Sequence, residues 1–195
     1  MENIWQTAAR NQARAREIIQ KTNLIGIWES VGAEVRLVGS LKMGLLMKHR
    51  DIDFHIYSDR LRLSDSFNSI SRLAENPGIG RLEYRNLLRT EEECIEWHAW
   101  YEDTDHQSWQ IDMIHIRKGS YYDGYFEKMA ERICRVLTPE TRLAILALKN
   151  DTPESEKIMG VEYYQAVIRD GIRNYHDFTE WRKRHPVSGI VEWIP

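Results

Sequence analysis

The chain has 195 residues with a formal net charge of −3, and 42% of its residues are hydrophobic. These values are typical of a globular protein with one domain, or with a small domain and a helical appendage, and the acidic balance argues against a broad nucleic-acid-binding face. The two cysteines, Cys94 and Cys134, exclude a disulfide framework and a thiolate zinc site. The sequence shows neither a secretory signal nor a run of membrane-spanning length, so we expect a cytoplasmic protein without membrane contact.

Residues 1–117 show the patterns of a mixed α/β domain. Apolar residues recur at three- and four-residue spacing at the N-terminus, and short apolar runs follow. These patterns predict helices over residues 2–21 and 24–30, a strand over 34–38, a short helix over 41–47 and a strand over 51–57. A further helix is expected over residues 66–75, with Ser64 or Asp65 as its cap.

Three more strands are expected before residue 117. They cover residues 79–88, 94–102 and 108–116. The charged clusters between them, at 89–93 and 102–107, are typical of turns. We therefore expect these strands to form a largely antiparallel meander.

Residues 118–195 change character and show only helical patterns. Helices are expected over residues 122–135, 139–150, 154–169 and 175–184. Thr138 before Pro139 and Thr152 before Pro153 are helix-start signals. The sequence thus predicts an α+β fold, with a mixed β-sheet and flanking helices at 1–117 and a C-terminal helical bundle at 118–195.

The chemistry centres on residues 37–57. Gly39 and Ser40 follow an apolar strand, and ten residues later Asp51 and Asp53 lie one residue apart in a second strand. Side chains at i and i+2 share a face of a strand, so both carboxylates point the same way while Ile52 and Phe54 point into the core. Two adjacent carboxylates favour a bound cation, and a Gly-Ser turn offers backbone N–H groups and a hydroxyl to phosphate oxygens.

Asp112 is the third candidate carboxylate. It lies between apolar residues in a predicted strand with the same pattern of apolar and acidic residues as the strand of Asp51 and Asp53. An aspartate in such surroundings is disfavoured by propensity and by burial, and therefore calls for a functional reason.

This set of motifs resembles the DNA polymerase β-like nucleotidyltransferase superfamily, whose signature is Gly-Ser, about ten residues, Asp-x-Asp and a later acidic residue on a neighbouring strand. The resemblance covers roughly residues 35–116, and the layout is similar to that of the small aminoglycoside and lincosamide nucleotidyltransferases. It implies an enzyme that moves a nucleoside monophosphate from a nucleoside triphosphate, ATP being the expected donor, to a hydroxyl group, with release of pyrophosphate.

The resemblance also implies roles for individual residues. Asp51, Asp53 and Asp112 would be metal ligands for Mg²⁺, with two ions expected, and Asp112 would alternatively be the base that activates the acceptor hydroxyl. The triphosphate would be bound by Gly39 and Ser40, with Lys42 as the nearest cation and Lys149 as a further candidate from the helical half. The position of Lys149 is otherwise well explained by the helix dipole, which favours a cation at a helix C-terminus.

The chain departs from the pattern at two positions. Met43 stands where many relatives carry Arg, and Arg50 where many carry Ser, which affects donor binding more than the metal site. We expect the acceptor to be a small molecule or a protein rather than nucleic acid, because neither charge nor length provides a nucleic-acid module. The alternative is an inactive family member that binds nucleotide or a partner protein, and a homodimer stays open.

The remaining histidines and aromatic residues give weaker signals. His55 shares the face of Asp51 and Asp53 and is as readily a structural histidine as a site residue. His98, His106 and His115 show no common metal-ligand spacing, so we interpret them as structural or exposed. We interpret the aromatic residues Trp97, Trp100, Tyr101 and Trp109 as packing residues, in preference to a surface on which a base stacks.

Overall fold

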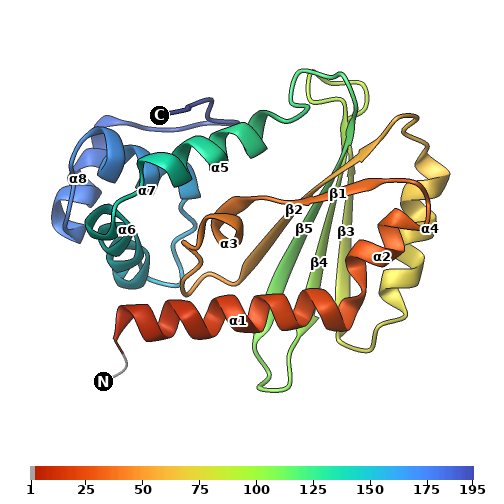
Figure 1. The fold of residues 1–195 in the computed structure, drawn as a ribbon, viewed down its shortest axis with the longest axis horizontal. Helices are drawn as coiled ribbons and strands as arrows, with labels where there is room; N and C mark the ends of the chain where they lie inside the picture. Colours follow the sequence, from red (N-terminus) through yellow and green to blue (C-terminus); the bar gives the residue numbers. More distant parts are fainter. Residues whose placement is uncertain (1–2) are drawn as a thin grey trace.

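The computed structural model describes residues 3–195, and its centre is one five-stranded mixed sheet (Figure 1). The strands are β1 (Glu34–Leu37), β2 (Asp51–Ser58), β3 (Ile79–Asn86), β4 (Cys94–Glu102) and β5 (Ser108–Arg117). Their order in the sheet is β1-β2-β5-β4-β3. β2 pairs with β5 in parallel, and every other pair is antiparallel, so the expected meander of β3, β4 and β5 is confirmed.

Helices precede, interrupt and follow the strands. In the first half these are α1 (Ile4–Thr22), α2 (Leu24–Glu29), α3 (Gly39–Met43) and α4 (Leu63–Ala74). In the second half they are α5 (Tyr125–Val136), α6 (Pro139–Asp151), α7 (Gly160–Tyr164), the π-helix η1 (Gln165–Arg169) and α8 (Tyr175–Arg184). The mixed sheet with flanking helices confirms the predicted α+β fold. The first residue expected in the N-terminal helix, Glu2, lies outside the described residues.

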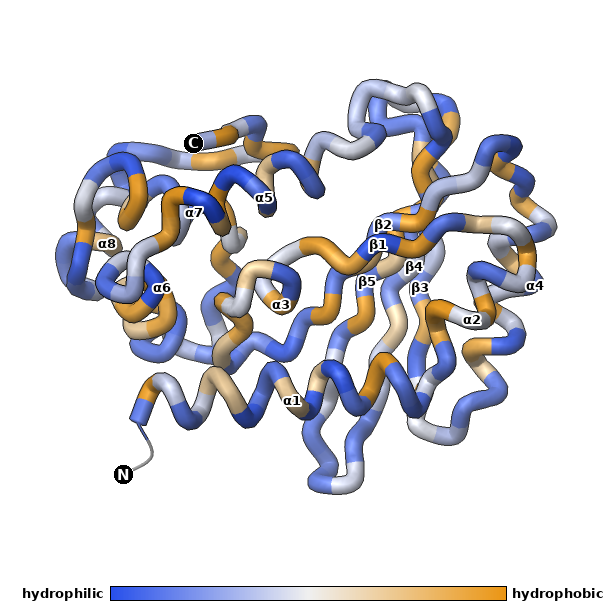
Figure 2. The backbone as a smooth tube through the Cα atoms, in the orientation of Figure 1, coloured by the Kyte–Doolittle hydropathy of each residue, from blue (hydrophilic) through white to orange (hydrophobic). Residues whose placement is uncertain are grey.

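One face of the sheet is covered by α1, α2 and α4, and the main hydrophobic core lies there. Alternate residues of the three central strands point into it, among them Ile52 and Phe54 as expected, and the sheet contributes Ile52, Phe54, Ile56, Ile95, Trp97, Ala99, Tyr101, Trp109, Ile111 and Met113. The α1 tube alternates hydrophobic and hydrophilic residues accordingly (Figure 2). Because side chains alternate along a strand, the residues between these face the opposite side of the sheet.

The helical half has a second core that includes residues from the first half. Met43 and Leu45, which follow the Gly-Ser turn, pack with buried residues of α5, α6, α7 and α8. At the other side, Ala8 of α1 packs with Met47 and Leu146. The segment that connects the two aspartates to the Gly-Ser turn is therefore held by both halves of the chain.

Three predicted elements differ in the structure. The short helix expected over residues 41–47 is α3, which already begins at Gly39, so that the Gly-Ser turn is its first turn, and it ends at Met43, with Gly44 in the left-handed conformation as its C-cap. α4 begins at Leu63 after Arg62, and neither Ser64 nor Asp65 caps it. The helix expected over residues 154–169 is formed only from Gly160, because the Thr152 hydroxyl donates back to the Leu148 carbonyl, which ends α6 instead of starting a new helix. The Thr138 cap is confirmed, with its hydroxyl accepting from the Thr141 N–H. Among the described residues, none of the helices is both long and apolar enough to cross a bilayer.

A buried hydrogen-bond group fixes α5 to β2. The Tyr57 hydroxyl donates to the Glu127 carboxylate at 2.7 Å and accepts from the Gly124 N–H at 3.2 Å. The same carboxylate oxygen lies 3.5 Å from His55 Nδ1. This group ties the start of the helical half to the strand that carries Asp51 and Asp53.

Replacement of Tyr57 by Phe removes both hydrogen bonds and keeps the ring. We expect the free energy of unfolding to fall by about 1–3 kcal/mol, because the partly buried Glu127 carboxylate loses its shortest hydrogen bond. Urea denaturation measures the change. Tyr84→Phe is the matched control, since Tyr84 is 40% exposed and should change stability little; equal effects of the two substitutions would contradict the role given to this group.

Candidate active site

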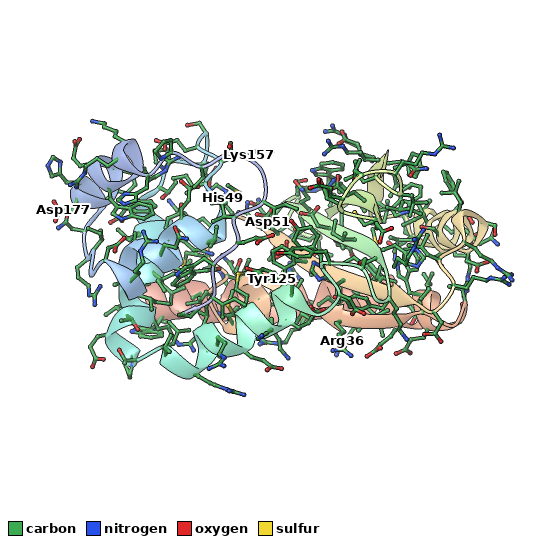
Figure 3. All side chains as sticks on the ribbon, turned by 90° about the horizontal axis from the view of Figure 1, so that it is seen from above. Arg36, His49, Asp51, Tyr125, Lys157 and Asp177 are labelled. Carbon is green, nitrogen blue, oxygen red and sulfur yellow. The ribbon has the colours of Figure 1, made fainter. Side chains whose placement is uncertain are left out.

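Three carboxylates meet on the face of the sheet that α1, α2 and α4 leave open. Asp51 and Asp53 are on β2, and the parallel register places Asp112 of β5 directly beside Asp53. All three line one cavity of about 450 Å³, together with Gly39 and Ser40. The view from above places Asp51 between the sheet and the helical half (Figure 3).

The carboxylates of Asp51 and Asp53 accept no hydrogen bond from any residue that the structure describes. Both side chains are half-buried, and burial, followed by the negative charges of Asp112 and Asp51, raises the pKa of Asp53 to about 7. Burial and Asp112 also raise the pKa of Asp51. Buried carboxylates without donors are unfavourable unless a cation compensates them.

The Gly-Ser turn lies against the second of these aspartates. Gly39 adopts a left-handed conformation with φ +65°, and a Cβ at this position would overlap the Asp53 carboxylate. The Val38 N–H donates to the Asp53 carbonyl at 2.9 Å, which holds turn and strand together. The turn thus needs a glycine both for its backbone angle and for its closeness to the carboxylate.

The helical half contributes a buried lysine. Lys149 of α6 is 7% exposed, and its Nζ lies 3.5 Å from the Tyr164 hydroxyl. Burial lowers the pKa of Lys149 to about 8, although Asp51 and Asp53 act in the opposite direction. It lines a small cavity that adjoins the main one and shares Ser40 and Asp51 with it. Lys42, by contrast, is exposed on α3 and does not line either cavity.

Asp112 differs from the other two carboxylates because it has donors. His98 Nδ1 lies 2.6 Å from its Oδ1, and Gln110 Nε2 donates to the same oxygen at 2.8 Å. The hydrogen bond to Asp112 raises the pKa of His98, while burial acts against it. The sequence interpretation of His98 as structural or exposed missed this contact; the signal was the hairpin register, which pairs residues 98 and 112.

His55 lines the cavity, as its shared face with the aspartates suggested, and its ring also packs against Phe126 of α5. The aromatic residues of β4 divide between the two faces: Trp97 packs in the core, where its Nε1 donates to Ser66 Oγ at 2.8 Å. Trp100 lies on the open face under the guanidinium of Arg81.

The donor set fits hard divalent cations. Carboxylate oxygens are the ligands that Mg²⁺ prefers, and those of Asp51 and Asp53 are free of other partners among residues 3–195. Within these residues, the ligand atoms of Glu92, Cys94 and Glu96 form the only group of three that lie within 4.8 Å of one another. The carboxylate oxygens of Asp51, Asp53 and Asp112 therefore do not all lie within this distance of one another.

Comparison with known proteins identifies the fold. No family model matches the chain, and no curated protein sequence matches it. Several solved structures, by contrast, match its fold. The Cid1 poly(U) polymerase bound to MgGTP aligns with a TM-score of 0.59 and 15% identity over 81% of this chain and 49% of its own. The poly(A) polymerase complex GLD-2–GLD-3 aligns with a TM-score of 0.57 and 9% identity over 86% of this chain and 58% of its own.

A cytoplasmic RNA terminal U-transferase aligns with a TM-score of 0.53 and 13% identity over 80% of this chain and 44% of its own. The chain therefore shares the fold of these polymerases and of the U-transferase, as the resemblance of its motifs to nucleotidyltransferases predicted. It spans about half the length of these polymerases.

Replacement of Gly39 by Ala tests the closeness of the turn to Asp53. We expect it to remove Mg²⁺-dependent stabilisation by nucleoside triphosphates, because the methyl group displaces either the turn or the carboxylate. Thermal shift with and without Mg²⁺ measures the effect. Gly80→Ala is the control, since a Cβ there meets open space; unchanged stabilisation in Gly39→Ala would show that the turn takes no part in binding.

The raised pKa of Asp53 predicts a pH-dependent response to metal. Without metal, the folded state holds the Asp53 proton up to about pH 7, whereas the unfolded chain releases it near 3.8. The metal-free protein therefore loses stability as pH rises from about 4 to 7, and Mg²⁺ must displace the proton. We expect Mg²⁺ to raise Tm by roughly 5 °C more at pH 8 than at pH 5.5.

The same scans on Asp53→Asn provide the control. The asparagine cannot titrate, so the metal-free variant should be more stable than the parent protein at pH 8 and similar to it at pH 4. A parent protein whose Mg²⁺ response is the same at both pH values would contradict the assigned proton.

Proposed function

We propose that this chain is a Mg²⁺-dependent nucleotidyltransferase that moves a nucleoside monophosphate from a nucleoside triphosphate to a hydroxyl group of a small molecule or a protein. The observation that carries the proposal is the convergence of Asp51, Asp53 and Asp112 in one cavity with the Gly-Ser turn. A surface cluster of acidic residues would not need the Gly39 backbone to approach Asp53 this closely.

The proposed metal ligands are the three aspartates. Asp51 and Asp53 would hold two ions, and Asp112 would complete the site from the neighbouring strand. When bound, Mg²⁺ supplies charge neutralisation and orientation of phosphate oxygens. Its binding would also offset the burial and the mutual repulsion that raise the pKa values of Asp51 and Asp53.

The proposed triphosphate site combines the turn and the buried lysine. Ser40 offers its hydroxyl at the junction of the two cavities, and Lys149 offers an ammonium group from the other side. Tyr164, near Lys149, lies in the same wall. Cid1, which shares this fold, has been solved with MgGTP and with Mg 3′-dATP. We take ATP as the donor of first choice and test all four nucleoside triphosphates.

In the proposed reaction, the acceptor oxygen forms a bond to the α-phosphorus. The bond between that phosphorus and the oxygen bridging to the β-phosphorus breaks, and pyrophosphate leaves with that oxygen. The hydroxyl proton passes to a base, for which Asp112 is the candidate because it lies at the edge of the cavity formed by β5. Alignment of acceptor and phosphorus by the cavity walls supplies much of the rate enhancement in such transfers.

The acceptor class is supported by the charge of the cavity. Among residues 3–195, those that line the main cavity include neither lysine nor arginine, while three of them are aspartates. A polynucleotide acceptor would therefore find no cationic side chain for its backbone in the lining of this cavity. RNA is nevertheless the second candidate acceptor, because the solved structures with this fold are named as poly(A) and poly(U) polymerases and an RNA terminal U-transferase.

The double substitution of Asp51 and Asp53 by Asn tests the catalytic proposal. We expect Mg²⁺-dependent pyrophosphate release, measured with each nucleoside triphosphate over a panel of small-molecule, protein and RNA acceptors, to fall by about a thousand-fold or more. Asp59→Asn is the control, because Asp59 directly follows β2, the strand of both aspartates, and its side chain is 90% exposed.

The pattern of results separates the alternatives. Turnover that survives the double substitution would refute the metal site. Metal-dependent thermal stabilisation by nucleotide without pyrophosphate release over the whole panel would indicate a nucleotide-binding regulatory module instead. Transfer to RNA alone would replace the small-molecule or protein acceptor.

A further inference from the structure

We propose that His98 and Gln110 position the third carboxylate, so that Asp112 presents only its Oδ2 oxygen to the metal and the acceptor. The proposal rests on the proposed function and assigns to His98 the task of a positioning residue. It concerns how the site is set before any reaction occurs.

The geometry of the three strands carries this inference. In the sheet register Asp112 lies between Asp53 of β2 and His98 of β4, so that the three side chains form one row across the open face. His98 Nδ1 and Gln110 Nε2 approach Asp112 from β4 and from β5 itself, at 2.6 and 2.8 Å. A carboxylate with donors from two directions on one oxygen is fixed in rotation about its side-chain bonds.

Both contacts involve the same oxygen, Oδ1. No group in residues 3–195 donates to Oδ2, which is therefore the oxygen left for a ligand. Asp51 and Asp53 have no donors among the described residues and can follow the ions, whereas Asp112 is held before an ion arrives. The site thus combines two adaptable ligands with one preset ligand.

The His98 ring is itself supported on its far side. Its side chain is 26% exposed, and Nε2 lies 4.0 Å from a Glu96 carboxylate oxygen. That carboxylate is also 3.4 Å from Arg85 Nη1. A histidine donates from Nδ1 whether it is neutral in that tautomer or charged, so its positioning role does not require a change of protonation. Outer partners of metal ligands commonly fix ligand orientation in this way.

The test replaces His98 by Phe, which keeps a ring and removes the donor, and by Asn, whose amide nitrogen takes the place of Nδ1. Mn²⁺ binding, measured by electron paramagnetic resonance in the presence of a non-hydrolysable ATP analogue, is the readout that does not depend on transfer. We expect His98→Phe to weaken Mn²⁺ binding by about ten-fold, and His98→Asn to restore most of it.

A second measurement distinguishes positioning from a general structural effect. In the Asp112→Asn background, His98→Phe should change Mn²⁺ affinity no further, because its target carboxylate is gone. His106→Ala is the control for loss of a histidine, since the side chain of His106 is 86% exposed in the β4–β5 turn. In turnover assays, kcat should fall more than KM for the nucleotide rises.

Each outcome of these experiments supports or overturns one of the proposals. Unchanged Mn²⁺ affinity in His98→Phe, or equal losses in the presence and absence of the Asp112 carboxylate, would overturn the positioning role and leave the proposed function intact. Failure of the unmodified protein to bind Mn²⁺ at all would overturn the metal site and this proposal together. Metal binding without pyrophosphate release would refute only the catalytic proposal.

Discussion

The parallel pairing of β2 with β5 is the constraint on which the site depends. It joins two strands that are about sixty residues apart in the chain and places Asp53 beside Asp112, both of them half-buried. The β3–β4 hairpin lies beyond β5, so β4 can support Asp112 from its other side. With a register shifted by one residue, one of these carboxylates would point into the hydrophobic core.

The electrostatic consequence is a site in which like charges are forced together by the sheet. Each strand is fixed by its apolar residues on the opposite face, such as Ile52 and Ile111, which are almost completely buried. The carboxylates cannot separate without disturbing this packing. The free energy of folding therefore carries the repulsion, and a bound cation or a proton on Asp53 relieves it.

The helical half completes the site through contacts that cross the molecule. Arg142 of α6 donates to the carbonyls of Met43 and Gly44 at 2.7 and 3.0 Å, which satisfies the end of α3. Lys149, two turns further along α6, reaches the cavity edge. The same helix thus secures the Gly-Ser turn and supplies the buried cation. The domain boundary expected after residue 117 remains a proposal, because residues on both sides of it contribute to the cavity and to the packing of α3.

The sequence predicts the fold and singles out the three aspartates because the periodicity of apolar residues and the spacing of the motifs are local features of the chain. Asp51 and Asp53 share a face by strand geometry alone, and Asp112 stands out among apolar neighbours. The contact of His98 with Asp112 depends on the hairpin register, and the expected turn at 102–107 fixes its centre only to within about one residue, which is enough to exchange the two faces of a strand.

The burial of Lys149 depends on how α6 packs against the rest of the molecule, which no local sequence pattern predicts. The helix expected at 154–169 begins only at Gly160 for a similar reason, since Thr152 ends α6 through its bonds to the Leu148 carbonyl, and its hydroxyl also contacts Tyr163.

The close approach of Gly39 to Asp53 has an evolutionary consequence. Any side chain at position 39 meets the Asp53 carboxylate, and the turn also requires a positive φ. A second substitution cannot compensate, because the atom that would have to move belongs to the aspartate itself. A smaller residue at position 53 would make space only by removing the carboxylate. A side chain at position 39 is therefore compatible only with loss of the carboxylate at position 53, and with it of the proposed metal site.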